Sequence, residues 1–145
     1  MKTKHTLFLF IILVTVSTIG SAQDRKVEKI EFNTLTRGYM ENVMITADSV
    51  IFTKGGNSKE KQKKNGRLTT KKEWKCLLKK IQSIDLSNIS ELESPTMKRA
   101  FDGAKHSKIV IYNNGKSYQH LFDDENPHQI LSGLMICIVD IKDRE

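Results

Sequence analysis

The segment SPTMKRAFDGAKH, residues 94–106, gathers side chains that could do acid–base or binding chemistry. It places Lys98, Arg99, Asp102 and His106 within nine residues, on a connection of the kind that often carries function. A carboxylate and an imidazole can exchange a proton, and the two cations can hold an anion. A structural interpretation competes with this one, because Arg99 and Asp102 could pair with each other and stiffen the connection. We favour the structural role and keep the four residues as binding candidates.

A metal site is a second option for the polar residues near the C-terminus. His106, His120, Asp123, Asp124 and His128 could supply ligands, but their spacing matches no zinc signature. Each has a simpler role, such as opening a strand, lying on an apolar face or preceding a helix. We therefore expect no metal ion and no cofactor.

Nucleophilic catalysis has less support. The chain contains no Gly-x-Ser-x-Gly, and no catalytic-cysteine signature surrounds Cys76 or Cys137. We therefore assign no catalytic residue. The alternative, a small hydrolase or metal-dependent protein that uses Asp102, His106 and His120, requires those three side chains to converge.

The segment Lys54–Lys80 is strongly basic, with eleven Lys and Arg against two Glu. Such a segment can bind anionic lipid headgroups, lipopolysaccharide or an acidic polysaccharide, and its candidate contacts are Lys61, Lys63, Lys64 and Lys75. Runs of charge are also typical of solvated surface. Nucleic acid is not expected, because only Trp74 interrupts the charges with an aromatic ring and the chain has an export signal, described below.

A hairpin from His106 to Phe122 organises the elements that would position these residues. Asn114-Gly115 separates two alternating runs, and this dipeptide is typical of a two-residue hairpin turn because both turn residues need positive φ. Centring the turn there predicts three cross-strand pairs, which are Tyr112 with Ser117, Ile111 with Tyr118 and Ile109 with His120.

Alternating patterns predict three further strands before the hairpin, at 27–36, 39–46 and 49–54, with Val43, Ile45, Val50 and Phe52 facing the core. Residues 55–66, GGNSKEKQKKNG, contain no apolar side chain and predict a mobile surface loop.

Two helices complete the pattern. Thr70 and Glu73 form a capping box that starts a helix ending near Ser83, and Asn126-Pro127 predicts the start of a last helix ending near Ile141. Residues 85–105 form a structured connection, since Pro95 prevents a continuous helix. The order β-β-β-α-β-β-α predicts an α+β fold, an antiparallel sheet of about five strands with both helices on one face.

The two cysteines invite a disulfide, but helical phase argues against it. Cys76 falls opposite the apolar stripe of its helix, whereas Cys137 lies within the stripe of the last helix. A bridge requires converging side chains. We therefore predict no bridge, with the bridged state as the alternative for an oxidising compartment.

The N-terminus carries the pattern of a secretory signal peptide at residues 1–22. Lys2 and Lys4 precede an apolar run of about 14 residues, and Gly20-Ser21-Ala22 suits cleavage. The run is shorter than the roughly 20 residues that span a bilayer. We expect export to the periplasm or the outside, one domain at residues 23–145, no later transmembrane segment and, without a nearby cysteine, no lipid anchor.

Three stretches, SPTMKRAFDGAKH, NGKSY and FDDENP, resemble a group of small secreted proteins of unknown function from Bacteroidota. The resemblance covers roughly the C-terminal half, with a weaker match at Phe32–Ile45. It implies export and a small α+β domain, and it implies no activity. Asp48-Ser49-Val50 also matches the short sequence at which such bacteria O-glycosylate exported proteins, which makes Ser49 a glycosylation hypothesis.

The sequence therefore predicts an exported, non-catalytic binding module. Its partner is either an unknown protein or an anionic component of the envelope.

Overall fold

The computed structural model describes residues 26–56, 62–101 and 104–145. The predicted signal peptide, Lys61 and Asp102 lie outside the described residues.

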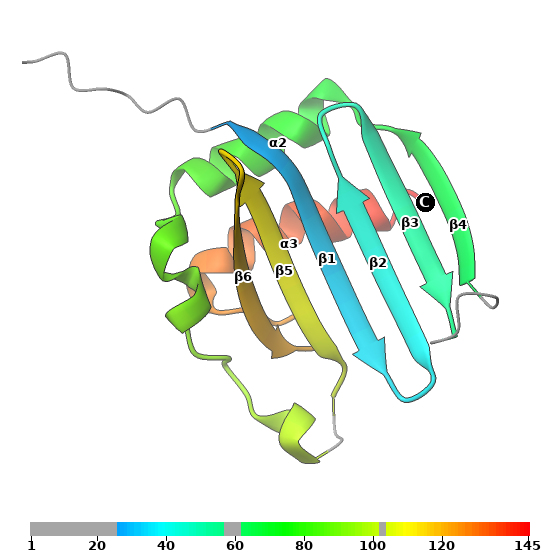
Figure 1. Ribbon diagram of the computed structural model, residues 1–145, viewed down its shortest axis with the longest axis vertical. Coiled ribbons are helices and arrows are strands. Elements are labelled where there is room, and N and C mark those ends of the chain that lie inside the picture. The colour runs from blue at the N-terminus through cyan, green and yellow to red at the C-terminus, as the bar shows by residue number, and fades with distance from the viewer. Residues whose placement is uncertain (1–25, 57–61, 102–103) are drawn as a thin grey trace, which may run out of the picture.

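The protein has an α+β fold built on an antiparallel sheet (Figure 1). The six described strands run in the order β4-β3-β2-β1-β5-β6. Their bounds are β1 Val27–Thr36, β2 Tyr39–Ile45, β3 Ser49–Gly55, β4 Gln62–Leu68, β5 His106–Asn113 and β6 Lys116–Asp123. The α-helices are α2 Lys71–Gln82 and α3 Gln129–Lys142, and two 3₁₀ turns, η3 Leu86–Glu91 and η4 Lys98–Phe101, lie in the connection. The predicted class and the two helices are confirmed.

One face of the sheet forms the core together with both helices. Strand alternation sends Ile30, Phe32, Val43, Phe52 and Ile111 toward the helices, and each is 2% exposed or less. The helices lie side by side behind the sheet in Figure 1, with α2 running from the β4 edge toward β6 and α3 running back. The opposite face of the sheet carries neither helix.

The hairpin is confirmed in its predicted register. Tyr112 pairs with Ser117, Ile111 with Tyr118 and Ile109 with His120. Asn114 and Gly115 have φ of 51° and 71°, as the tight turn requires.

The predicted loop at 55–66 is wrong over its second half. Residues 62–66 belong to β4, which pairs with β3 along its length. Every side chain of β4 is exposed or half-buried. Because β4 is an edge strand held through backbone hydrogen bonds, it needs no apolar pattern, and composition alone could not reveal it.

The helix caps divide into one confirmed prediction and one correction. Thr70 and Glu73 form the predicted capping box at the start of α2. At α3 the cap is His128, whose Nδ1 accepts from the Ile130 N–H at 3.3 Å. Asn126 instead forms a bridge with Asp123, so it belongs to the turn after β6.

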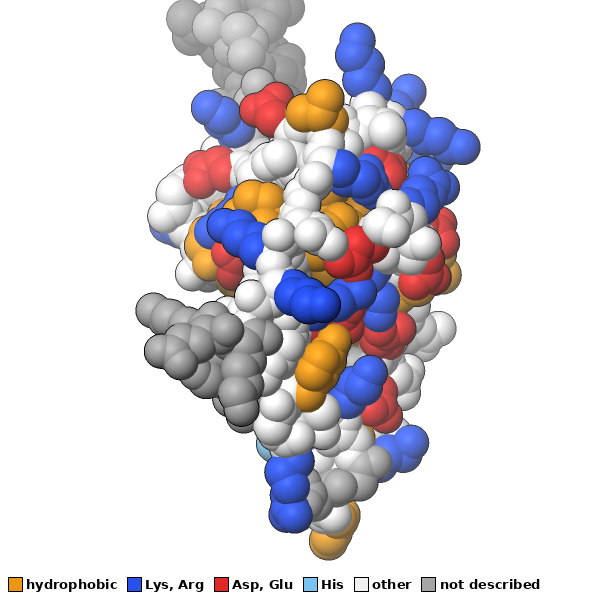
Figure 2. Space-filling view, turned by 90° about the vertical axis from the view of Figure 1, so that its right-hand side faces the viewer, with side chains coloured by type: hydrophobic (Ala, Val, Ile, Leu, Met, Phe, Trp, Pro, Cys, Tyr) orange, Lys and Arg blue, Asp and Glu red, His pale blue; other side chains and the backbone are white. Residues whose placement is uncertain are grey.

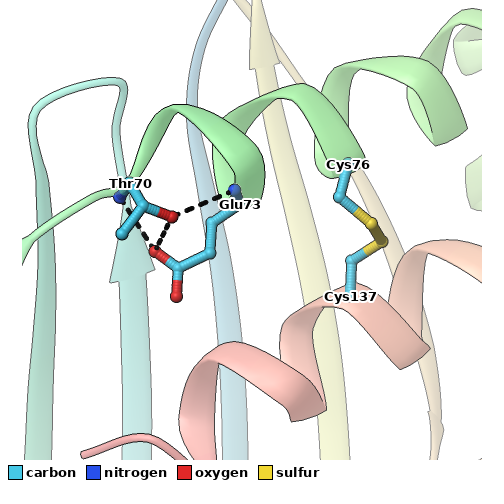
Figure 3. The surroundings of a disulfide bond; sticks show 4 residues. All are labelled: Thr70, Glu73, Cys76 and Cys137. Atoms are coloured by element: carbon cyan, nitrogen blue, oxygen red, sulfur yellow. Dashed lines mark hydrogen bonds between the residues drawn. A yellow bond between two sulfur atoms is a disulfide. The ribbon is translucent and has the colours of Figure 1, made fainter.

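The prediction that the cysteines are not bridged is wrong. Cys76 and Cys137 form a disulfide with their Cα atoms 6.3 Å apart. Cys76 and Glu73 are three residues apart and lie on the flank of α2 that faces α3 (Figure 3). This flank faces α3 and is neither the side toward the sheet nor the side toward solvent. A helical wheel that divides α2 only into a buried and an exposed side therefore misplaces Cys76.

None of the described helices is both long and apolar enough to cross a bilayer.

Candidate functional site

A buried carboxylate at the end of β6 holds the connection that the sequence singled out. Asp123 is 1% exposed and accepts hydrogen bonds from the Thr96 hydroxyl, the Lys98 N–H at 2.8 Å and Arg99 Nη1 at 3.4 Å. Burial would raise the pKa of the Asp123 carboxyl, but the hydrogen bonds and the Arg99 charge outweigh it and lower that pKa. Asp123 therefore remains a carboxylate that anchors η4 to the sheet.

This contact changes the assignment of Arg99. The ion pair described for Arg99 is with Asp123, whereas the sequence suggested Asp102, which lies outside the described residues. Lys98 is exposed beside it, and its backbone rather than its ammonium group makes the anchoring contact. The structural role expected for this segment is thus filled by a residue 24 positions further on.

A groove of about 530 Å³ lies between the connection and β6. Its lining combines hydroxyl, amide, charged and apolar side chains from both walls: Ser90, Leu92, Glu93, Ser94, Met97, Arg99, Gln119 and Leu121. Of the described residues of the sequence-predicted site, Arg99 is the one that lines it. Gln119 and Leu121 carried no sequence signal beyond their place on a strand.

His106 and His120 do not converge. Strand alternation from the pairs His106–Asp123 and Ile109–His120 puts the two imidazoles on opposite faces of the sheet. His106 is exposed, whereas His120 is 1% exposed. The constellation that a hydrolase or metal-dependent protein would need is therefore not assembled by these two residues.

His120 is instead a core residue. Its ring stacks on Phe122 with centroids 5.4 Å apart, and its Nε2 accepts from the His128 N–H at 3.3 Å. Burial lowers the pKa of the His120 imidazole and the nearby His128 and Arg99 lower it further, against a hydrogen bond with the Ile89 backbone. Within the part of the chain that the structure describes, no three His, Cys, Asp or Glu residues are grouped to hold a metal ion.

The basic segment is divided into separate surfaces. Lys54 pairs with Glu41 and Glu145, and Arg67 pairs with Glu73, so part of its charge is neutralised within the fold. Figure 2 views the β4 side of the molecule, where Lys and Arg side chains are interspersed with Asp and Glu.

The predicted contacts Lys63, Lys64 and Lys75 do not form one cluster. Lys63 and Lys64 are exposed neighbours on β4 and therefore point to opposite faces of the sheet. Lys63 lies roughly 16 Å along the strand from Leu68, after which the chain turns into the helix that carries Lys75.

The lysines of α2 form the more coherent surface. Lys72, Lys75 and Lys79 are three and four residues apart, so they share one side of the helix, and all three are exposed. Buried Leu77 and Ile81 lie on the other side. Among the described residues, none of these three lysines forms an ion pair. We call this set the α2 lysine face; of its three members, only Lys75 is among the binding candidates predicted from the sequence.

In comparisons with protein-family models, with curated proteins and with solved structures, nothing matches this chain. The likeness to secreted proteins of Bacteroidota remains a prediction.

Proposed function

We propose that this protein is an exported, non-catalytic binding module that contacts an anionic component of the cell envelope through the α2 lysine face. The observation that carries the proposal is the row of exposed cations formed by Lys72, Lys75 and Lys79 on one side of a helix. A fixed row of cations raises the local concentration of an anionic surface and speeds its association.

The contacts that hold α2 in the fold support this role. The capping box fixes its first turn, Arg67 binds Glu73 at that end, and the disulfide ties Cys76 to α3. A helix held at three points presents its lysines in a constant arrangement, which lowers the entropy lost on binding.

Two features support export. Residues 1–22 have the pattern of a signal peptide, and the Cys76–Cys137 bridge suits an oxidising compartment, since disulfides persist there and are rare in the cytosol.

Co-sedimentation with vesicles tests the proposal. The protein is expected to bind phosphatidylcholine vesicles that contain phosphatidylglycerol and to lose that binding with added salt. Each lysine near an anionic surface contributes about 1 kcal/mol, so the Lys72→Gln, Lys75→Gln, Lys79→Gln variant should bind roughly 100-fold more weakly.

A matched variant controls for total charge. Lys26, Lys105 and Lys116 are exposed and lie outside α2, so their replacement by Gln removes the same charge from other surfaces. Equal losses in the two variants would reduce the effect to net charge and contradict a defined face. A parallel arm with a soluble acidic polysaccharide shows whether the anion must be presented by a lipid.

A further inference from the structure

Two residues of β6, Gln119 and Leu121, line the groove and belong to the last strand of the described sheet. Just after β6, the Asp124 N–H donates to the Lys105 carbonyl at 2.9 Å. In an antiparallel pair, residues that exchange hydrogen bonds alternate with residues whose backbone points away. Counting back from Asp124 by twos gives the β6 residues bonded to β5, so Gln119 and Leu121 direct their N–H and C=O groups outward.

The described part of the connection, which forms the opposite wall, supplies no backbone partner to these outward groups. Among the residues that the structure describes, no backbone–backbone hydrogen bond outside the strand ladder reaches Gln119 or Leu121. Yet both residues line the groove together with Leu92 and Met97. The outward backbone groups of β6 therefore belong to two residues that line a concave part of the surface.

The spacing of the free groups selects the class of ligand. Residues 119 and 121 repeat donor and acceptor about 6.6 Å apart along the strand, a period that an extended peptide backbone matches. A groove of about 530 Å³ falls within the range of ordinary ligand sites. Strand addition of this kind takes affinity from the backbone and specificity from side-chain pockets.

The side chains around the edge define what the peptide carries. Leu121 and Met97 are 54% and 61% exposed and, with Leu92, offer an apolar contact in the groove. The Arg99 guanidinium also lines it, and the hydrogen bond described for its side chain uses Nη1 toward Asp123. Its remaining donors suit a carboxylate.

We propose that this groove binds an extended segment of a partner protein as an additional strand beside β6, with an apolar residue against Leu121 and Met97 and an acidic residue at Arg99. This site is separate from the α2 lysine face and does not depend on it.

Selection from a phage-displayed library of random dodecapeptides, with the purified, disulfide-bonded protein as bait, tests the proposal. Enriched peptides should combine apolar and acidic residues. They should bind Gln119→Pro about tenfold more weakly, because proline removes one outward N–H donor from an edge strand and leaves the ladder to β5 intact.

Ser117→Pro is the matched control. Ser117 has the same outward phase on β6 but does not line the groove, so this variant should bind the peptides as the wild type does. If Gln119→Pro fails to fold, Ser90→Trp decides instead, because it fills the groove from the opposite wall, where Ser90 is exposed. Peptides that bind as tightly to Gln119→Pro and Ser90→Trp as to the wild type overturn the proposal, and so does a selection that enriches none. The α2 triple-glutamine variant should keep peptide binding, which separates this result from that of the vesicle test.

Discussion

Arg67 and Glu73 form a bidentate ion pair that joins the β4 edge to the helical layer. Nη1 and Nη2 of Arg67 donate to the Glu73 carboxylate at 3.0 and 2.8 Å, and Nη2 also donates to the Ile141 carbonyl at 3.1 Å. The same carboxylate accepts from the Thr70 N–H at 2.9 Å, so one buried side chain caps α2 and fixes an edge strand.

Replacing Glu73 with Gln should lower the free energy of unfolding by about 3 kcal/mol, because it leaves the Arg67 charge without its partner in a largely buried site. Urea denaturation with the disulfide intact measures this loss. Glu93→Gln removes an exposed carboxylate and should change stability little. A Glu73→Gln variant as stable as Glu93→Gln would contradict the role assigned to the pair.

The same ion pair should make the free energy of unfolding fall in acid. The Arg67 hydrogen bonds lower the pKa of Glu73 from 4.5 to about 2, with help from Thr70 and against the effect of burial. The unfolded chain therefore takes up a proton at higher pH than the folded protein does. The stabilisation is complete above pH 4.5 and should be lost as the pH falls toward 2. The unfolding free energies of wild type and Glu73→Gln should therefore converge as the pH falls over that range. A difference between them that does not change with pH would contradict the assigned role of Glu73.

His120 should add a pH dependence at milder acidity. Burial lowers the pKa of its imidazole below the ordinary value of 6.5, so the unfolded chain binds the proton first. The contribution of His120 to the free energy of unfolding should be complete above pH 6.5 and decline below it. His120→Phe should be less stable near neutral pH, because the contact with the His128 N–H is lost, but its stability should vary less with pH. An unchanged pH slope in His120→Phe would assign the effect to another group.

The disulfide should be a major source of stability. Cys76 and Cys137 are separated by 61 positions, and closing a loop of that size restricts the unfolded chain by about 4 kcal/mol. The Cys76→Ser, Cys137→Ser double variant should lose about that amount in urea denaturation. Reductant should destabilise the wild type by a similar amount and leave the variant unchanged. A wild type insensitive to reductant would show that the bridge contributes little.

Asp123 should control the order of the connection. Asp123→Asn weakens the bonds from Thr96 and Arg99, so amide hydrogen exchange should speed up across residues 96–101. Asp140→Asn, at an exposed position on α3, provides a control that should leave this segment protected. Equal protection in both variants would mean that other contacts hold η4.

The parts of the fold that could be predicted from the sequence are those marked by residues with a specific local role, such as a turn or a helix cap. The Asn114-Gly115 turn fixed the hairpin register, and Thr70 with Glu73 marked the start of α2. β4 escaped prediction because its pairing is a backbone property of an edge strand. The disulfide escaped because Cys76 becomes partly covered only when α3 packs beside α2.

The candidate site was predictable in composition but not in geometry. Arg99 was recognised as a residue with a structural partner, yet its described partner, Asp123, comes from a strand that follows 24 positions later. The basic segment forms one continuous run in the sequence, although most of β4 separates Lys63 from α2. Long-range contacts of this kind depend on how the elements pack, which local patterns do not encode.

Mapping amide shifts of the labelled protein by NMR, on addition of lipid nanodiscs that contain phosphatidylglycerol, tests the proposed function most directly. We expect perturbations at Lys72, Lys75 and Lys79 that are reduced by salt, with Lys26, Lys105 and Lys116 unaffected. Perturbations centred on those control lysines, or no perturbation at all, would contradict the claim that the α2 lysine face binds an anionic envelope component.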